Sequence, residues 1–209
     1  MRFTLFYVII LFITTSYAES VDNKAIDKFK SYLEQIKTLA VDFKQVDSKG
    51  EEAHGKLLIN KPYKFRCNYY PPFPLVIIGN KNYVTVYDYD MKQASRIKSS
   101  ENIFNFLLAD QVDFDKYFQF EVATENESEI YVRLYHDLSE RRSAITINKN
   151  SGQITNMKIL EEDNVIEISF SNALKVQKFD ENLFIFKNPE IFGPPERLDK
   201  IALEQRYYL

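Results

Sequence analysis

Short segments in which apolar and polar residues alternate recur along most of this chain, and turn-forming residues separate them. In residues 63–69, the alternating larger side chains are Tyr63, Phe65, Cys67 and Tyr69. Further segments of this kind are 83–87, 118–122 and 166–170. A period of two predicts β-strands with one buried and one solvated face. Turn signals at intervals of roughly ten residues predict an antiparallel meander of ten or eleven strands.

Two segments instead have helical spacing. After a possible N-cap at Asp22, the apolar residues recur every three or four positions, at Ile26, Phe29, Leu33, Ile36 and Ala40. A second, shorter helix is expected from about Ser99 to Asp110, and its apolar residues are Ile103, Phe104, Phe106, Leu107 and Leu108. Many strands and few helices predict one large curved sheet with the helices on one side. Such a sheet encloses a hollow that side chains fill or a ligand occupies, and the pattern alone leaves both possibilities open.

The N-terminus has the features of an export signal. Arg2 supplies a positive charge, residues 3–13 are almost wholly apolar, and Ser16-Tyr17-Ala18 provides small residues at a cleavage site. We therefore expect a signal peptide at residues 1–18 and an exported mature protein from Glu19, without a cysteine near the cut that could be lipidated. The remainder is expected to form one domain, 19–192. For the tail, 193–209, either a flexible segment or an added edge strand remains open.

Composition and motifs favour binding over catalysis. A net charge of −3 argues against a nucleic-acid partner. The single cysteine, Cys67, excludes an internal disulfide and is expected to be a small buried side chain. His54 and His136 lack the spacing of metal ligands, so no cofactor or metal is expected, and a nucleophile pair of Cys67 with His54 is a remote alternative. The Asp88 and Asp90 pair is interpreted as part of a turn.

Several motifs then resemble a known family. Residues 39–45 (Leu-Ala-Val-Asp-Phe-Lys-Gln), interpreted as the end of a helix, precede a Gly-x-Leu strand that runs into Lys61-Pro62-Tyr63-Lys64-Phe65-Arg66. Pro72-Phe73-Pro74 follows, then residues 75–81 and the segment Val86-Tyr87-Asp88 ending at Gln93. This series resembles the LolA family of bacterial lipoprotein carriers, most strongly over residues 33–110. The chain departs from the family where Cys67 occupies a position that often holds Trp.

The resemblance implies an open, incomplete β-barrel of about 11 strands, lidded by two or three helices over a hydrophobic cavity. It implies a monomeric carrier in the periplasm of a Gram-negative bacterium. The carrier would take triacylated lipoproteins from an inner-membrane ABC lipoprotein-release complex to the outer membrane, where a lipid-anchored receptor is a further possible partner. The alternatives are a carrier of another envelope lipid, such as a polyisoprenoid or phospholipid, and an envelope regulator that senses acyl chains.

The same resemblance suggests functional residues. Those expected to bind acyl chains or to form the lid are Ile26, Phe29, Leu33, Ile36, Phe65, Ile103, Phe104, Phe106 and Leu107. Lys61 stands where the family commonly carries a basic residue. Its ammonium is expected to bind the carbonyls near Leu108 to Asp110 and so to latch the lid. Arg66 is a second basic candidate for the latch or for cargo transfer, although a solvated side chain is the simpler expectation at that position.

Overall fold

The computed structural model describes the chain except for residues 1–19, 100–107, 138, 162–163, 199–206 and 209. Its helical elements are α1 (Asn23–Gln35), α3 (Phe114–Tyr117), the 3-10 helix η2 (Glu181–Phe184) and α4 (Pro189–Phe192). Its strands are β1 (Thr38–Val46), β2 (Glu52–Asn60), β3 (Lys64–Tyr69), β4 (Leu75–Gly79), β5 (Tyr83–Asp88), β6 (Gln93–Lys98), β7 (Phe118–Glu125), β8 (Glu129–His136), β9 (Arg141–Asn148), β10 (Gln153–Leu160), β11 (Val165–Leu174), β12 (Lys178–Phe179) and β13 (Tyr207–Tyr208).

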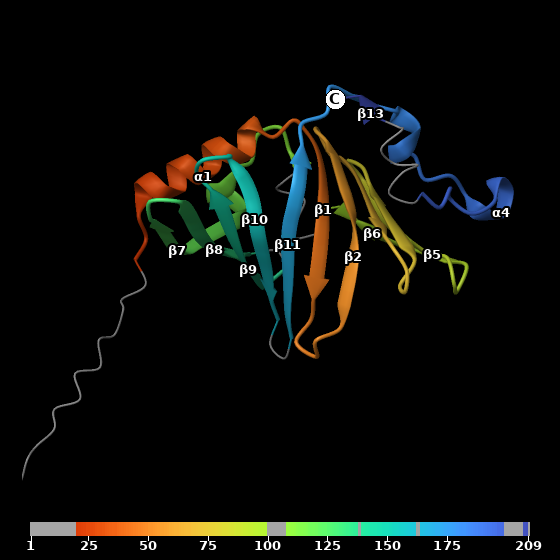
Figure 1. The fold of residues 1–209 in the computed structure, drawn as a ribbon, viewed down its shortest axis with the longest axis horizontal. Coiled ribbons are helices and arrows are strands. Elements are labelled where there is room, and N and C mark those ends of the chain that lie inside the picture. The colour runs from red at the N-terminus through yellow and green to blue at the C-terminus, as the bar shows by residue number, and fades with distance from the viewer. Residues whose placement is uncertain (1–19, 100–107, 138, 162–163, 199–206, 209) are drawn as a thin grey trace, which may run out of the picture.

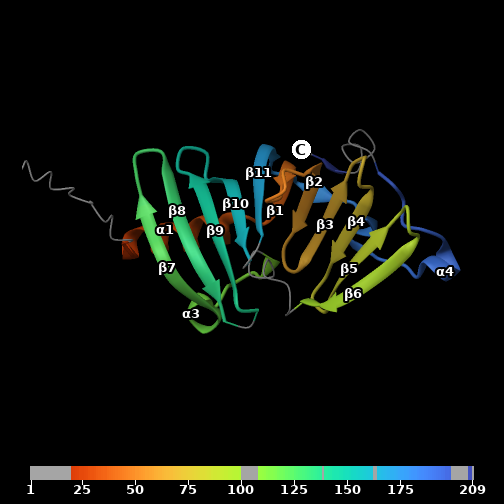
Figure 2. The ribbon, with the colours of Figure 1, turned by 90° about the horizontal axis from the view of Figure 1, so that it is seen from below.

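Eleven of these strands form one antiparallel sheet in the order β6-β5-β4-β3-β2-β1-β11-β10-β9-β8-β7. Two meanders, β1 to β6 and β7 to β11, are joined at the centre because β1 pairs with β11, with Phe43 opposite Phe170. Strands β6 and β7 remain at the two edges, so the sheet curves without closing into a barrel (Figure 2). The predicted mainly-β fold with one large, unclosed sheet is therefore confirmed.

Helix α1 covers one half of the sheet. The Asp22 Oδ1 accepts a hydrogen bond of 2.9 Å from the Lys24 amide and caps the helix, as the sequence predicts. The apolar face of α1 packs on the inner face of β7 to β10 (Figure 1). Its buried side chains are Ala25, Ile26, Phe29 and Leu33.

The predicted helical stripe extends too far at its C-terminal end. Helix α1 ends at Gln35, and Ile36 already has extended backbone angles. Residues 39–45, interpreted as the end of that helix, instead belong to β1, where Ala40 is buried against Leu58. The spacing of Ala40 fits both periods, but the β-forming residues Thr38 and Val41 around it favour a strand.

The C-terminal segment, residues 176–198, covers the opposite, outer face of the other half of the sheet. Its buried side chains are Val176, Phe179, Leu183, Phe184 and Leu198, and they pack on Ala40 and Leu58. Farther along the sheet, Phe186 packs against the cluster that contains Tyr87. Strand β13 pairs with β12 in a separate two-stranded sheet. Figure 1 shows this segment beside the half of the sheet that α1 leaves uncovered.

This cover makes one sequence expectation wrong. Lys64, Arg66 and Asn68 alternate with the larger side chains of β3 and were expected to face solvent. Arg66 and Asn68 are each only 3% exposed, whereas Lys64 is half-buried. Both faces of β3 are therefore covered, the inner one by the curl of the sheet and the outer one by the C-terminal segment.

The second predicted helix falls mostly on residues 100–107, which lie outside the described part of the chain. Beyond them, the Tyr63 amide donates a hydrogen bond of 2.7 Å to the Leu108 carbonyl, and Lys37 forms an ion pair with Asp110. Among the residues that the structure describes, none of the helices combines the length and the hydropathy needed to cross a bilayer.

Candidate functional site

An apolar hollow of about 310 Å³ lies on the inner face of the sheet. The curl of the sheet brings strands from both meanders to its wall, so that Phe43 and Phe65 share it with Ile159 and Phe170. The complete lining is Phe43, Leu57, Ile59, Phe65, Cys67, Tyr69, Ile77, Val84, Val86, Ile97, Leu108, Arg141, Met157, Ile159, Ile168 and Phe170. A concave, mostly apolar site with few polar groups is typical of a ligand pocket.

A glycine shapes one wall of the hollow. Gly79 in β4 lies opposite Phe65 in β3, and the Phe65 ring lies over the Gly79 backbone. A Cβ atom at residue 79 would stand 1.7 Å from Cε1 of that ring. Only glycine lets Phe65 occupy this position, so the residue pair fixes where the aromatic wall stands.

The predicted acyl-chain residues do not all reach this hollow. Phe65 lines it. Ile26, Phe29 and Leu33 instead pack into the core under α1. Ile36 lines a smaller hollow of about 60 Å³, which shares residues such as Leu57 and Phe170 with the larger one. The predicted residues Ile103, Phe104, Phe106 and Leu107 lie outside the described part of the chain.

Sequence reasoning missed most of the wall. The alternation in β10 and β11 places Met157 and Ile159 on one face and does the same for Ile168 and Phe170. That pattern was available from the sequence. The alternation does not reveal that β11 pairs with β1. This pairing brings the side chains of β10 and β11 to the same hollow as those of β2 and β3.

Cys67 stands in the wall as a half-buried side chain. Burial raises the pKa of its thiol, so the thiolate is scarce at neutral pH. Cys67 pairs across the strands with Leu57, and His54 is three residues from Leu57 in β2. Because strand side chains alternate, His54 faces the other side of the sheet. The remote alternative of a Cys67 and His54 nucleophile pair is wrong.

Lys61 binds a different carbonyl from the one expected. Its Nζ donates a hydrogen bond of 2.9 Å to the Leu33 carbonyl, at the C-terminal end of α1. The expected contact with the carbonyls near Leu108 to Asp110 is therefore wrong for this structure, where the Tyr63 amide binds Leu108. A cation at the C-terminal end of a helix is still favourable. Lys61 thus ties the β2–β3 turn to α1.

The free energy of unfolding should depend on pH over the range in which Lys61 titrates. Burial first, and the nearby positive charge of Lys37 second, lower its pKa from 10.5 to about 8. Between these values the unfolded chain binds more protons than the folded one, so the free energy of unfolding should rise with pH. Urea unfolding of the wild type and of Lys61→Met can be compared from about pH 7.5 to about pH 10.5. The rise in the free energy of unfolding that is due to Lys61 should appear only in the wild type. Lys98→Met, an exposed control, should retain it; an equal rise in Lys61→Met contradicts the assignment.

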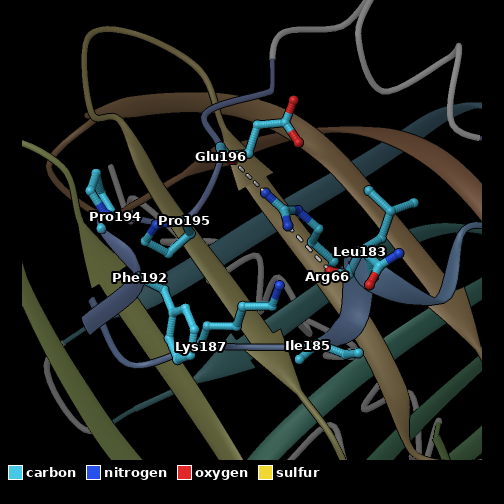
Figure 3. Close-up of a pocket in the computed structure, with 10 residues that line it drawn as sticks. Arg66, Leu183, Ile185, Lys187, Phe192, Pro194, Pro195 and Glu196 are labelled. Carbon is cyan, nitrogen blue, oxygen red and sulfur yellow. Dashed lines mark hydrogen bonds between the residues drawn. The ribbon is translucent and has the colours of Figure 1, made fainter. Parts of the chain in front are cut away.

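Arg66 lies on the outer face, away from the hollow. Its Nε donates to the Asn68 Oδ1 at 2.9 Å. Its Nη atoms donate to the carbonyls of Leu183 at 3.2 Å and Glu196 at 2.9 Å (Figure 3). A pocket of about 180 Å³ beside it is lined mainly by the C-terminal segment, including Lys187 and Phe192. The expectation of a solvated Arg66 is wrong, because this side chain anchors the C-terminal segment to β3.

The acidic pair in the β5–β6 turn has a structural role. The Asp88 Oδ1 accepts hydrogen bonds from the amides of Asp90 at 2.9 Å and Met91 at 2.8 Å, so the interpretation of this pair as a turn is confirmed. The described residues contain no group of three or more His, Cys, Asp or Glu side chains that could hold a metal ion.

Comparison with known proteins gives this site a family context. A family model described as "Outer membrane lipoprotein carrier protein LolA" matches residues 34–187. An uncharacterized protein of Rickettsia prowazekii is 54% identical over 99% of this chain and 98% of its own length. An outer-membrane lipoprotein carrier protein of Methylococcus capsulatus is 24% identical over 88% of this chain and 93% of its own length.

A second named relative and a solved structure show weaker or shorter likeness. The outer-membrane lipoprotein carrier protein of Chromobacterium violaceum is 37% identical over 40% of this chain and 42% of its own length. The crystal structure of a LolA superfamily protein from Nitrosomonas europaea has 12% identity and a TM-score of 0.46, covering 77% of this chain and 97% of that one. The family match extends from the end of α1 to the C-terminal segment and includes every strand that lines the hollow. This chain therefore belongs to the LolA family of outer membrane lipoprotein carrier proteins.

Proposed function

We propose that this protein is a periplasmic chaperone that binds the acyl chains of lipoproteins in its hollow and carries them to the outer membrane. The observation that carries the proposal is the apolar hollow of about 310 Å³ in a chain of the LolA family. The mostly apolar lining suits binding, and the described residues of the wall assemble no catalytic group. We therefore propose carriage without a chemical step.

The free energy cost of exposing acyl chains to water explains the apolar lining. Exposing an acyl chain of about 16 carbons to water costs roughly 0.8 kcal/mol per methylene, on the order of 10 kcal/mol per chain. A lipoprotein with three chains therefore needs a cover while it crosses an aqueous space. The carrier must also release its cargo, so the loaded state has to compete with an empty state of similar free energy.

The size of the hollow bears on that competition. A volume of about 310 Å³ lies at the lower end of the range for ligand pockets, about 300–1,000 Å³. Three acyl chains need more room, so binding must widen the space between the two meanders. We propose that Ile103, Phe104, Phe106 and Leu107 contact the acyl chains, because the next residue in the sequence, Leu108, lines the hollow. We assign to the lid the residues of α1 that pack on the sheet, namely Ile26, Phe29 and Leu33. Ile36, just after α1, stands at the edge of this lid.

The proposed route follows from this role. A signal peptide at residues 1–18 would export the chain to the periplasm of a Gram-negative bacterium. There the protein, as a monomer, would accept triacylated lipoproteins from an inner-membrane ABC release complex. It would pass them to the outer membrane directly or through a lipid-anchored receptor.

The limited volume also favours a second candidate, a carrier of a lipid with fewer chains. Mass spectrometry of the protein purified from its native envelope separates the two. Triacylated polypeptides bound to it support lipoprotein carriage, whereas phospholipid or polyisoprenoid alone supports the second candidate. Depletion of the protein should strand lipoproteins in the inner membrane only under the first.

Cys67 provides a direct test of where acyl chains bind. A triacylated peptide in the hollow should slow maleimide labelling of Cys67 by about tenfold or more, because the chains would occupy the space beside the thiol. The labelling rate is measured by mass spectrometry with and without peptide, and the same peptide without acyl groups is the control. Tight binding of the acylated peptide with an unchanged labelling rate would place the acyl site elsewhere.

A further inference from the structure

A charged side chain stands in the wall of the hollow. Among the described residues that line it, Arg141 is the single charged one. Arg141 begins β9, its side chain is 52% exposed, and its Nη1 lies 3.5 Å from the Glu161 Oε1. A side chain that lines the hollow and also reaches solvent stands at the mouth, where the interior meets water.

Polar groups gather at this same end of the sheet. Strand β9 begins at Arg141, β10 ends at Leu160 and β11 begins at Val165, so these strand ends are neighbours. The ends of β1 and β3 join them, and there the Tyr69 hydroxyl donates a hydrogen bond of 2.9 Å to the Gln45 Oε1. Figure 1 shows the β1–β2 connection and the start of β11 together at the lower end of the sheet. Along its described residues, the hollow therefore runs from a polar mouth to a mostly apolar interior.

The described residues of the interior wall include no charged side chain. Ile59 and Phe65 line it farther from the mouth, and Val84 and Leu108 stand beside them in one apolar cluster. An amphiphilic ligand gains most when its tails lie along this wall and its oxygen-bearing head lies at Arg141. The two ends of the hollow thus give a bound lipid one favoured orientation.

We propose that Arg141 is a head-group contact that donates hydrogen bonds to the carbonyl oxygens linking acyl chains to the cargo. This inference rests on the proposed carrier function and names the part of the cargo that the mouth recognises. The guanidinium carries five N–H donors in a planar fork, more than the contact with Glu161 uses. Because Glu161 balances its charge, uncharged ester and amide oxygens are better partners for Arg141 than a free anion.

The test compares two synthetic peptides. Both carry three C16 chains on the N-terminal cysteine, but in the second the two ester bonds of the glyceryl group are replaced by ether bonds. Their tails match, so the ratio of their dissociation constants isolates recognition of the carbonyl oxygens. Wild-type protein is expected to bind the ester peptide about fivefold to tenfold more tightly. In Arg141→Met, which keeps an apolar stem, the ratio should fall to about one.

The neighbouring arginine supplies the control. Arg142 alternates to the other side of β9 and binds the Glu121 Oε1 at 2.8 Å, so Arg142→Met should keep the wild-type ratio. A change that only loosens the fold would weaken both peptides equally and leave the ratio intact. An unchanged ratio in Arg141→Met, or no preference in the wild type, overturns the inference. Failure of the wild type to bind either peptide overturns the proposed function as well.

Discussion

Ile168→Glu is expected to weaken binding of a triacylated peptide by at least about 100-fold. Ile168 lies in β11 and its side chain faces the hollow, opposite Gln45 of β1. A carboxylate there has to remain hydrated or lose its charge, and an acyl chain laid against it removes the water. The dissociation constant can be followed by displacement of a fluorescent fatty-acid probe.

The next residue along β11 provides a matched control for this substitution. Ser169 is exposed on the outer face, opposite Lys44 of β1, so Ser169→Glu adds the same charge without entering the hollow. It should bind the peptide as the wild type does. Circular dichroism and thermal unfolding show whether each variant remains folded. If folded Ile168→Glu binds the peptide with unchanged affinity, acyl chains do not occupy this hollow.

Local pattern was sufficient for most of the strands and for the start of α1, although it extended the helix into β1. Each strand shows its two faces within a few residues, and Phe65, Cys67 and Tyr69 share the inner face as their alternation predicts. Asp22 caps α1 by contacts within the first turn. These features depend on neighbours in the sequence, so the sequence is enough to predict them.

The burial of polar residues, the partner of Lys61 and the wall of the hollow depended on parts of the chain that are distant in sequence. The burial of Arg66 depends on its contacts with residues 183 and 196. The sequence around Arg66 does not indicate that the C-terminal segment covers it. Lys61 was assigned to the wrong carbonyl because its partner, Leu33, is 28 residues away and is brought close only by the fold. Likewise, the pairing of β1 with β11 decides that Ile168 and Phe65 face one hollow. Curvature and long-range pairing were therefore the missing information.

The outer face of the sheet also carries a buried ion pair. Lys56 in β2 lies opposite Asp42 in β1, with its Nζ 2.9 Å from the Asp42 Oδ1. The Lys56 side chain is 1% exposed and that of Asp42 is 18% exposed. Asn172 donates a further hydrogen bond of 2.9 Å to the Asp42 Oδ2. Removing one partner would leave the other charge with little access to water.

Lys56→Met is therefore expected to lower the free energy of unfolding by about 3 to 5 kcal/mol. The reason is the Asp42 carboxylate, which stays desolvated after its ammonium partner has gone. The double variant Lys56→Met with Asp42→Leu should recover most of the loss, because it removes both charges.

Lys64→Met is the comparison at the surface. It breaks the 2.6 Å pair with Glu181, whose side chains are 42% and 60% exposed, and should cost about 1 kcal/mol or less. Urea unfolding of the four proteins measures these differences; a double variant no more stable than Lys56→Met would show that the Lys56 stem, and not its charge, supports the fold.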